Sequence, residues 1–162
     1  MRKTLETLRG FGIALAITAL AGFLQNTNLL NISDIKPNLT LTVLIALSFF
    51  TANFFYYLIL VLVAGIFLRF ELTFETVNIV FTFLTLSVYW LEGKLPGRPF
   101  FNNILLVAGS TLIFYALADF SFLTSYPLTV FSEMLYNVIL GALVFFLSRR
   151  YLFHEQGFRT SF

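Results

Sequence analysis

The chain has 162 residues, of which 59% are hydrophobic and only 11% are charged, and its mean hydropathy is +0.89. A soluble domain carries about 25% charged residues and cannot bury this much apolar surface in one core, so the composition excludes an ordinary soluble protein. There is no cysteine, which excludes disulfides and thiolate metal sites. We therefore expect one integral domain in the lipid bilayer, with a net charge of +2 and no nucleic-acid partner.

The N-terminal segment combines two basic residues with an apolar run, MRKTLETLRGFGIALAITALAG. The triplet Ala19-Leu20-Ala21 has the small-x-small pattern of a signal-peptide cleavage site. Small residues also recur at steady i+4 spacing, as close helix packing requires: Gly10, Ala14, Thr18 and Gly22. We therefore predict an uncleaved first helix over about residues 10–24 with a packing face of small residues.

The second apolar block, Leu39–Leu68, is interrupted by one polar stretch, Thr51-Ala52-Asn53. A membrane-spanning helix needs about 20 residues, so this block is too long for one upright helix and too short for two comfortable ones. If the chain turns at the polar stretch, two short helices result, over about residues 39–50 and 54–68. Asn53 would then help to satisfy the freed backbone groups of the turn.

Basic residues favour this turn. With it, the chain forms six helices, and eight basic residues fall on the side of both termini: Arg2, Lys3, Arg9, Lys94, Arg98, Arg149, Arg150 and Arg159. The other side holds only Lys36 and Arg69. A single pass would split the basic residues four against six. Because cytoplasmic loops carry an excess of Lys and Arg, we predict a turn and both termini in the cytoplasm.

The second half of the chain predicts three further helices, over about residues 72–91, 100–118 and 130–147. A basic turn broken by prolines, EGKLPGRPF, separates the first two. A short external loop over Ser121–Thr129, which contains Pro127, separates the last two.

Polar residues form a stripe on the helix over residues 72–91. They are spaced by 4, 3, 4 and 3 positions and therefore share one helix face: Glu71, Glu75, Asn78, Thr82 and Thr85. A polar stripe in lipid must face protein or a water-filled cavity. It indicates a ligand cavity, a partner groove or ordinary interhelical hydrogen bonding.

The last helix has a similar pattern, with Glu133, Asn137 and Gly141 at i, i+4 and i+8. An unpaired amide at position 137 would cost about 1–3 kcal/mol, so Asn137 must have a partner, within the chain or on another subunit. Gly141 would let a neighbouring helix approach closely. These residues therefore predict a partner face or a helix-packing face.

Catalytic patterns are missing from the sequence. The lone His154 lies in the C-terminal tail, and no spacing typical of a metal site, phosphate loop or nucleophilic triad appears. We expect no enzyme activity, no metal and no cofactor. Arg149 and Arg150 close the last helix, either to bind anionic lipid or to fix the topology.

Two stretches carry a resemblance to a known family. In LQNTNLLNISDIKPNLTLTVLIAL, residues 24–47, a first helix ends at Gln25, and Pro37-Asn38 opens a short Leu-rich helix after a polar connection. In LYNVILGALVFFLSRRYL, residues 135–152, Asn137 lies in the first half of the helix and an Arg pair, Arg149 and Arg150, closes it. With the six-helix layout, these features resemble MreD, the rod shape-determining membrane protein of bacteria.

The resemblance implies an all-α bundle of six transmembrane helices in the bacterial inner membrane. It implies a non-enzymatic scaffold of cell-wall elongation that binds a single-pass MreC partner and helps to link the MreB filament to RodA and its transpeptidase. An alternative of another class remains open. Substrate-binding subunits of energy-coupling-factor importers have a similar architecture, and there the polar stripe over residues 72–91 would line a vitamin or metal-ion pocket.

Overall fold

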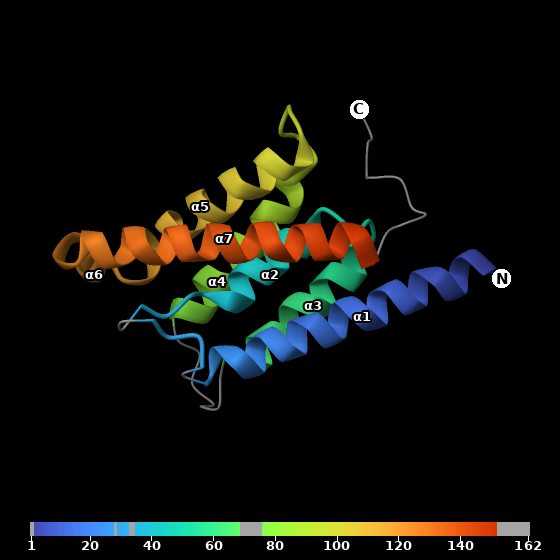
Figure 1. Cartoon of the computed structure of the whole chain (residues 1–162), viewed down its shortest axis with the longest axis horizontal. Coiled ribbons are helices and arrows are strands. Elements are labelled where there is room, and N and C mark those ends of the chain that lie inside the picture. Colours follow the sequence, from blue (N-terminus) through green and yellow to red (C-terminus); the bar gives the residue numbers. More distant parts are fainter. Residues whose placement is uncertain (1, 28, 33–34, 69–75, 152–162) are drawn as a thin grey trace.

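The computed structural model describes residues 2–27, 29–32, 35–68 and 76–151 (Figure 1). They form seven helices: α1 (Arg2–Gln25), α2 (Leu39–Ser48), α3 (Phe54–Phe67), α4 (Thr76–Glu92), α5 (Pro99–Ala118), α6 (Phe120–Ser125) and α7 (Pro127–Tyr151). No strand occurs among these residues, which confirms the predicted all-α class. Parts of α1, α5 and α7 are long and apolar enough to cross a membrane. These three helices indicate a membrane protein.

Side-chain contacts fix the directions of the first three helices. Phe11 of α1 stacks on Tyr56 of α3 with 4.7 Å between ring centroids, and Gly22 packs against Phe67, so α1 and α3 run parallel. Gln25, at the end of α1, bonds to Leu39 at the start of α2. The chain therefore runs up α1, back along α2 and up again along α3.

The remaining long helices alternate in the same way. Phe54, at the start of α3, contacts Tyr89 near the end of α4. In α5 and α7, Asn103 bonds to Gly141 and Tyr115 bonds to Glu133, so these two helices are antiparallel. The start of α1 and the end of α7 consequently lie at the same end of the bundle, which we call the terminal end (Figure 1). The opposite end, with residues 26–27, 29–32, 35–38 and α6, is the loop end.

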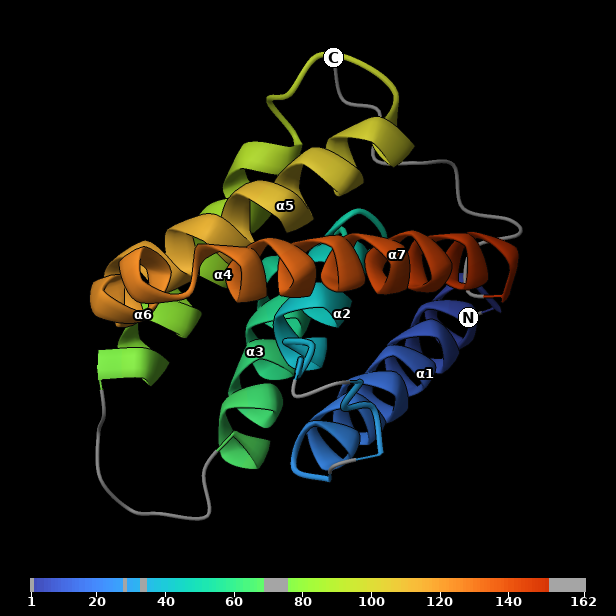
Figure 2. The same ribbon diagram turned by 60° about the vertical axis from the view of Figure 1, so that its left-hand side comes forward.

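Helix α2 occupies the centre of the bundle. All ten of its residues are buried, and it contacts α1, α3, α4, α5 and α7. In Figure 2, α2 lies behind α7 and between α3 and α1. Burial on all sides explains why its sequence, LTLTVLIALS, is apolar or weakly polar at every position and has no polar face.

The polar stretch Thr51–Asn53 lies in a turn between α2 and α3, as predicted. Helix α2 ends at Ser48, two residues before the predicted limit, because Phe50 and Thr51 both donate backbone hydrogen bonds to Leu47 O and close a tight turn. Asn53 caps α3, and its Oδ1 accepts from the backbone N–H of Phe55 at 2.8 Å. The expectation that Asn53 satisfies a freed backbone group is confirmed.

The predicted loop over Ser121–Thr129 is wrong, because α6 occupies its first half and α7 begins at Pro127. Asp119 caps α6, and its Oδ1 accepts from the backbone N–H of Phe122 at 2.9 Å. Proline is favoured in the first turn of a helix, where its missing N–H is not needed. The exposed Asp119 therefore serves as a helix cap.

Other helix boundaries also differ from the prediction. Helix α1 begins at Arg2 rather than near residue 10, and α7 ends at Tyr151 rather than at 147. Hydropathy marks only the apolar part of a helix, whereas charged residues at its ends stay helical while reaching water. Helix α4 begins at Thr76, and residues 72–75 of the predicted helix lie outside the described residues.

Candidate functional site

The start of α2 is held by side chains from three parts of the chain. Asn38 caps the helix, and its Oδ1 accepts from the backbone N–H of Leu41 at 3.2 Å. Asn137 Oδ1, from α7, accepts from the N–H of Asn38 at 2.9 Å. Gln25 Oε1, at the end of α1, accepts from the N–H of Leu39 at 2.6 Å. Since the first N–H groups of a helix have no partner within it, these three bonds satisfy groups that would otherwise be unpaired.

Asn137 uses both ends of its amide. Its Nδ2 donates to Thr111 Oγ1 of α5 at 3.2 Å, and Thr111 Oγ1 donates to the carbonyl of Val107 at 2.9 Å. The side chain is fully buried. One residue of α7 therefore ties together α2 and α5, and the partner that the sequence demanded for Asn137 lies within the chain.

Gly141 lies one turn further along α7, at the contact with α2 and α5. A Cβ at this position would lie 3.0 Å from Val107 Cγ2 and 3.3 Å from Thr42 Cγ2. These distances are shorter than ordinary contacts, so a side chain at position 141 would require Val107 and Thr42 to shift by a few tenths of an ångström. Asn137 and Gly141 thus form an internal packing face and are not exposed to a partner.

Glu133 anchors the loop end of the bundle. Its carboxylate accepts hydrogen bonds from the Tyr115 hydroxyl of α5 and from the backbone N–H of Lys36. Glu133 itself is buried, with 5% of its surface exposed. Lys36, in the described residues 35–38 before α2, is thereby fixed to α5 and α7. The sequence did not indicate Tyr115, although a tyrosine placed inside a helix bundle needs a partner for its hydroxyl.

Two tyrosines stabilise the other end of α2. The Tyr57 hydroxyl lies within hydrogen-bond distance of two carbonyl oxygens, at 3.3 Å from Leu44 O and 3.2 Å from Thr85 O. Tyr89 OH donates to Ala52 O, in the turn after α2, at 3.0 Å. The two rings stack with centroids 4.7 Å apart. These residues were missed in the sequence, because a tyrosine in an apolar run resembles any other aromatic residue.

Three members of the predicted polar stripe of α4 are among the described residues, and none of them is exposed. Thr85 is fully buried, and its Oγ1 donates to Phe81 O at 2.9 Å within α4. Asn78 and Thr82 are half-buried. Glu71 and Glu75 lie outside the described residues. The part of the stripe nearest the bundle centre is therefore used in helix packing.

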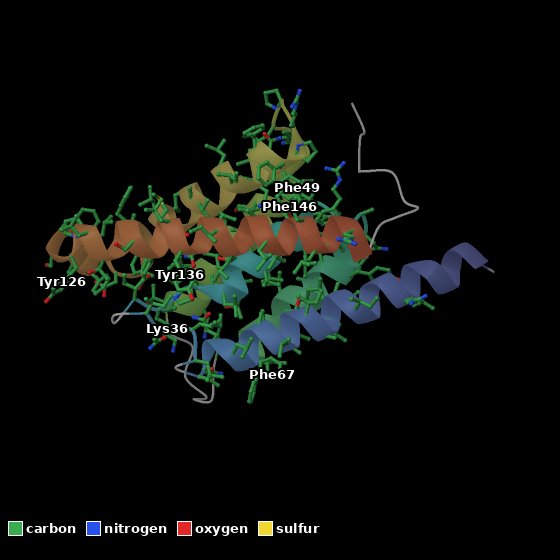
Figure 3. The ribbon with its side chains drawn as sticks, in the orientation of Figure 1. Lys36, Phe49, Phe67, Tyr126, Tyr136 and Phe146 are labelled. Atoms are coloured by element: carbon green, nitrogen blue, oxygen red, sulfur yellow. The ribbon has the colours of Figure 1, made fainter. Side chains whose placement is uncertain are left out.

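The remaining predicted residues lie at the two ends of the bundle. Pro37 is buried at the loop end, where it lines a shallow hollow with Leu24, Gln25 and Lys36. Figure 3 shows Lys36 at this end and Phe49 and Phe146 further toward the other. Exposed basic side chains lie at the terminal end: Arg9, Lys94, Arg98, Arg149 and Arg150. His154 lies outside the described residues.

Within the described residues, no group of three or more histidine, aspartate or glutamate side chains is placed to hold a metal ion. The chain matches no family model, no curated protein and no solved structure.

Proposed function

We propose that this chain is a non-enzymatic membrane scaffold of the MreD type, acting in bacterial cell-wall elongation. The observation that carries the proposal is the convergence at the start of α2. Gln25, Asn38 and Asn137, three of the residues that carry the resemblance to MreD, come from three segments of the chain and join in one hydrogen-bonded cluster. Residues that form one structural unit support a shared fold better than separate short motifs do.

The proposed fold crosses the membrane six times, with a short second and third helix. Helix α2 has 10 residues and α3 has 14, which correspond to about 15 Å and 21 Å, less than the roughly 30 Å of a hydrocarbon core. A helix can end at this depth only where protein satisfies its backbone groups. The bonds from Asn137, Gln25, Tyr57 and Tyr89 meet this requirement and so support the six-crossing arrangement.

The proposed orientation places the terminal end of the bundle in the cytoplasm. Five exposed basic side chains lie at that end, whereas Lys36 is the basic residue described at the loop end. By the positive-inside rule, this asymmetry supports cytoplasmic termini in the bacterial inner membrane.

The scaffold acts by presenting a rigid helical body to its partners. Because Asn137 and Gly141 are buried, the surfaces left for an MreC-like single-pass protein are the lipid-facing sides of the outer helices. With MreC bound, the body helps to connect the MreB filament to RodA and its transpeptidase. An importer subunit is less well supported, because α2 fills the centre of the bundle and Thr85 of the polar stripe is occupied in packing.

The proposal is tested by tagging the chain in its native host, extracting it in mild detergent and identifying co-purifying proteins by mass spectrometry. An unrelated tagged polytopic protein from the same host is the control. We expect a single-pass MreC-like protein, with cell-wall synthases, to be enriched over this control. Enrichment of paired ATPases with a coupling membrane protein would instead establish an importer and refute the scaffold.

A further inference from the structure

The helices around α2 form an open ring. Going round α2, contacts join α7 to α5, α5 to α4, α4 to α3 and α3 to α1. Between α1 and α7, however, no two described Cα atoms lie within 8 Å of each other. We call this open position the α1–α7 seam. In a membrane, lipid or protein must cover it.

The two sides of the seam are apolar. Phe11 and Gly22 place one flank of α1 against α3, so the opposite flank, which carries Gly10 and Ile17, faces the seam. A Cβ at Gly10 would meet no atom within 4 Å, which leaves this part of the flank open. On α7, Phe146 packs against Phe100 of α5, and the other flank presents three apolar residues: Leu140, Val144 and Leu147.

The seam is closed at the loop end of the bundle. Residues 35–38 and the start of α2 cross there, bonded to α7 through the N–H groups of Lys36 and Asn38 and to α1 through Leu39. At the terminal end, no described segment crosses between α1 and α7. An occupant therefore enters from the terminal-end leaflet.

Two arginines flank the open end at a similar depth. Arg9 lies 16 positions before Gln25 on α1, or about 24 Å along the helix, and Arg150 lies 13 positions after Asn137 on α7, or about 20 Å. Gln25 and Asn137 bond to adjacent residues at the start of α2 and so mark a common level. Both arginine side chains are exposed.

We propose that the α1–α7 seam binds an anionic diacyl phospholipid from the terminal-end leaflet. Its acyl chains lie along the apolar seam, and Arg9 and Arg150 bind its phosphate-bearing headgroup. Long arginine side chains reach the headgroup level readily, and basic sites between transmembrane helices recognise anionic headgroups. The positive charge and the apolar flanks together select this occupant over a zwitterionic lipid. The inference rests on the membrane-spanning bundle and is independent of the scaffold role.

The test uses the purified full-length chain in detergent, melted with added palmitoyl-oleoyl phosphatidylglycerol or with the matching phosphatidylcholine. We expect phosphatidylglycerol to raise the melting temperature more than phosphatidylcholine does. The double variant with Arg9→Gln and Arg150→Gln should lose most of this excess stabilisation. The control double variant, with Lys94→Gln and Arg98→Gln, removes the same charge from the α4–α5 turn and should retain the excess stabilisation.

Gly10→Leu provides a second test that keeps every charge. Its side chain projects where a Cβ meets no atom, so the chain should fold and the excess stabilisation by phosphatidylglycerol should fall. Equal stabilisation of the wild type by both lipids would overturn the proposal. An equal loss of the excess stabilisation in the Arg9/Arg150 double variant and in the Lys94/Arg98 double variant would also overturn it, because net charge alone would then explain binding. Retention of the full excess by Gly10→Leu would do the same.

Discussion

Asn137 Oδ1 accepts a hydrogen bond from the backbone N–H of Asn38 at 2.9 Å, across 99 positions of the sequence. This bond joins the last long helix to the start of the buried helix α2. With Gln25 Oε1 on the next N–H, it satisfies the backbone where α2 begins inside the bundle. The stability of the whole arrangement should therefore depend on a few polar side chains in an apolar protein.

Asn137→Leu removes the acceptor of Asn38 N–H and the donor to Thr111. We expect the free energy of unfolding in detergent to fall by about 0.6–2 kcal/mol, the range of interhelical hydrogen bonds in membrane proteins. Thermal melting of the purified variant measures this loss. Ile139→Leu, at a lipid-facing position two residues away, is the control and should leave the melting temperature unchanged. An unchanged melting temperature for Asn137→Leu would show that the cluster does not stabilise the fold.

Gly22→Ala and Gly10→Ala compare two glycines on different flanks of α1. A Cβ at Gly22 would overlap the Phe67 side chain of α3, whereas at Gly10 it would meet nothing. Gly22→Ala should therefore destabilise the protein by about 1–3 kcal/mol, as overpacking does. Gly10→Ala should be neutral or stabilising by up to about 1 kcal/mol, because alanine is the better helix former. The same melting assay compares them, and equal effects would contradict the close α1–α3 approach.

Glu133→Leu leaves the Tyr115 hydroxyl and the Lys36 N–H without their acceptor. Losing a buried acceptor should cost about 1–3 kcal/mol and should free the segment between α1 and α2. Hydrogen exchange of the backbone N–H groups in residues 35–38 should become faster. A general loss of packing would instead raise exchange throughout the bundle, so the location of the change distinguishes the two effects. Glu133→Gln keeps an acceptor oxygen and should show a smaller change. If exchange in the two variants matched that of the wild type, Glu133 would not anchor this segment.

Much of the fold could be predicted from the sequence because membrane helices are long apolar runs. The turn at Thr51–Asn53 followed from the length of its block and from the placement of basic residues. The demand for a partner of Asn137 followed from the cost of an unpaired amide in lipid. In both cases the physical constraint is local or depends only on composition, so it can be recognised without knowing the packing.

The parts that could not be predicted depend on packing or on short signals. Helix α6 has only six residues, fewer than any hydropathy window, although Asp119 and Pro127 are ordinary start signals for α6 and α7. Tyr57 and Tyr89 support the end of α2 only because α3 and α4 place them there. That Gly141 packs inside the bundle rather than against a partner likewise depends on where Val107 and Thr42 lie.

The six-crossing arrangement is tested most directly by cysteine labelling, since the chain has no cysteine of its own. Leu29→Cys lies exposed at the loop end, and Lys94→Cys lies exposed in the α4–α5 turn at the terminal end. Each variant is treated in intact cells with a membrane-impermeant maleimide, before and after permeabilisation. We expect Leu29→Cys to react in intact cells and Lys94→Cys to react only after permeabilisation. Reaction of both cysteines from the same side would mean that residues 39–68 cross the membrane once, which would contradict the six-crossing arrangement.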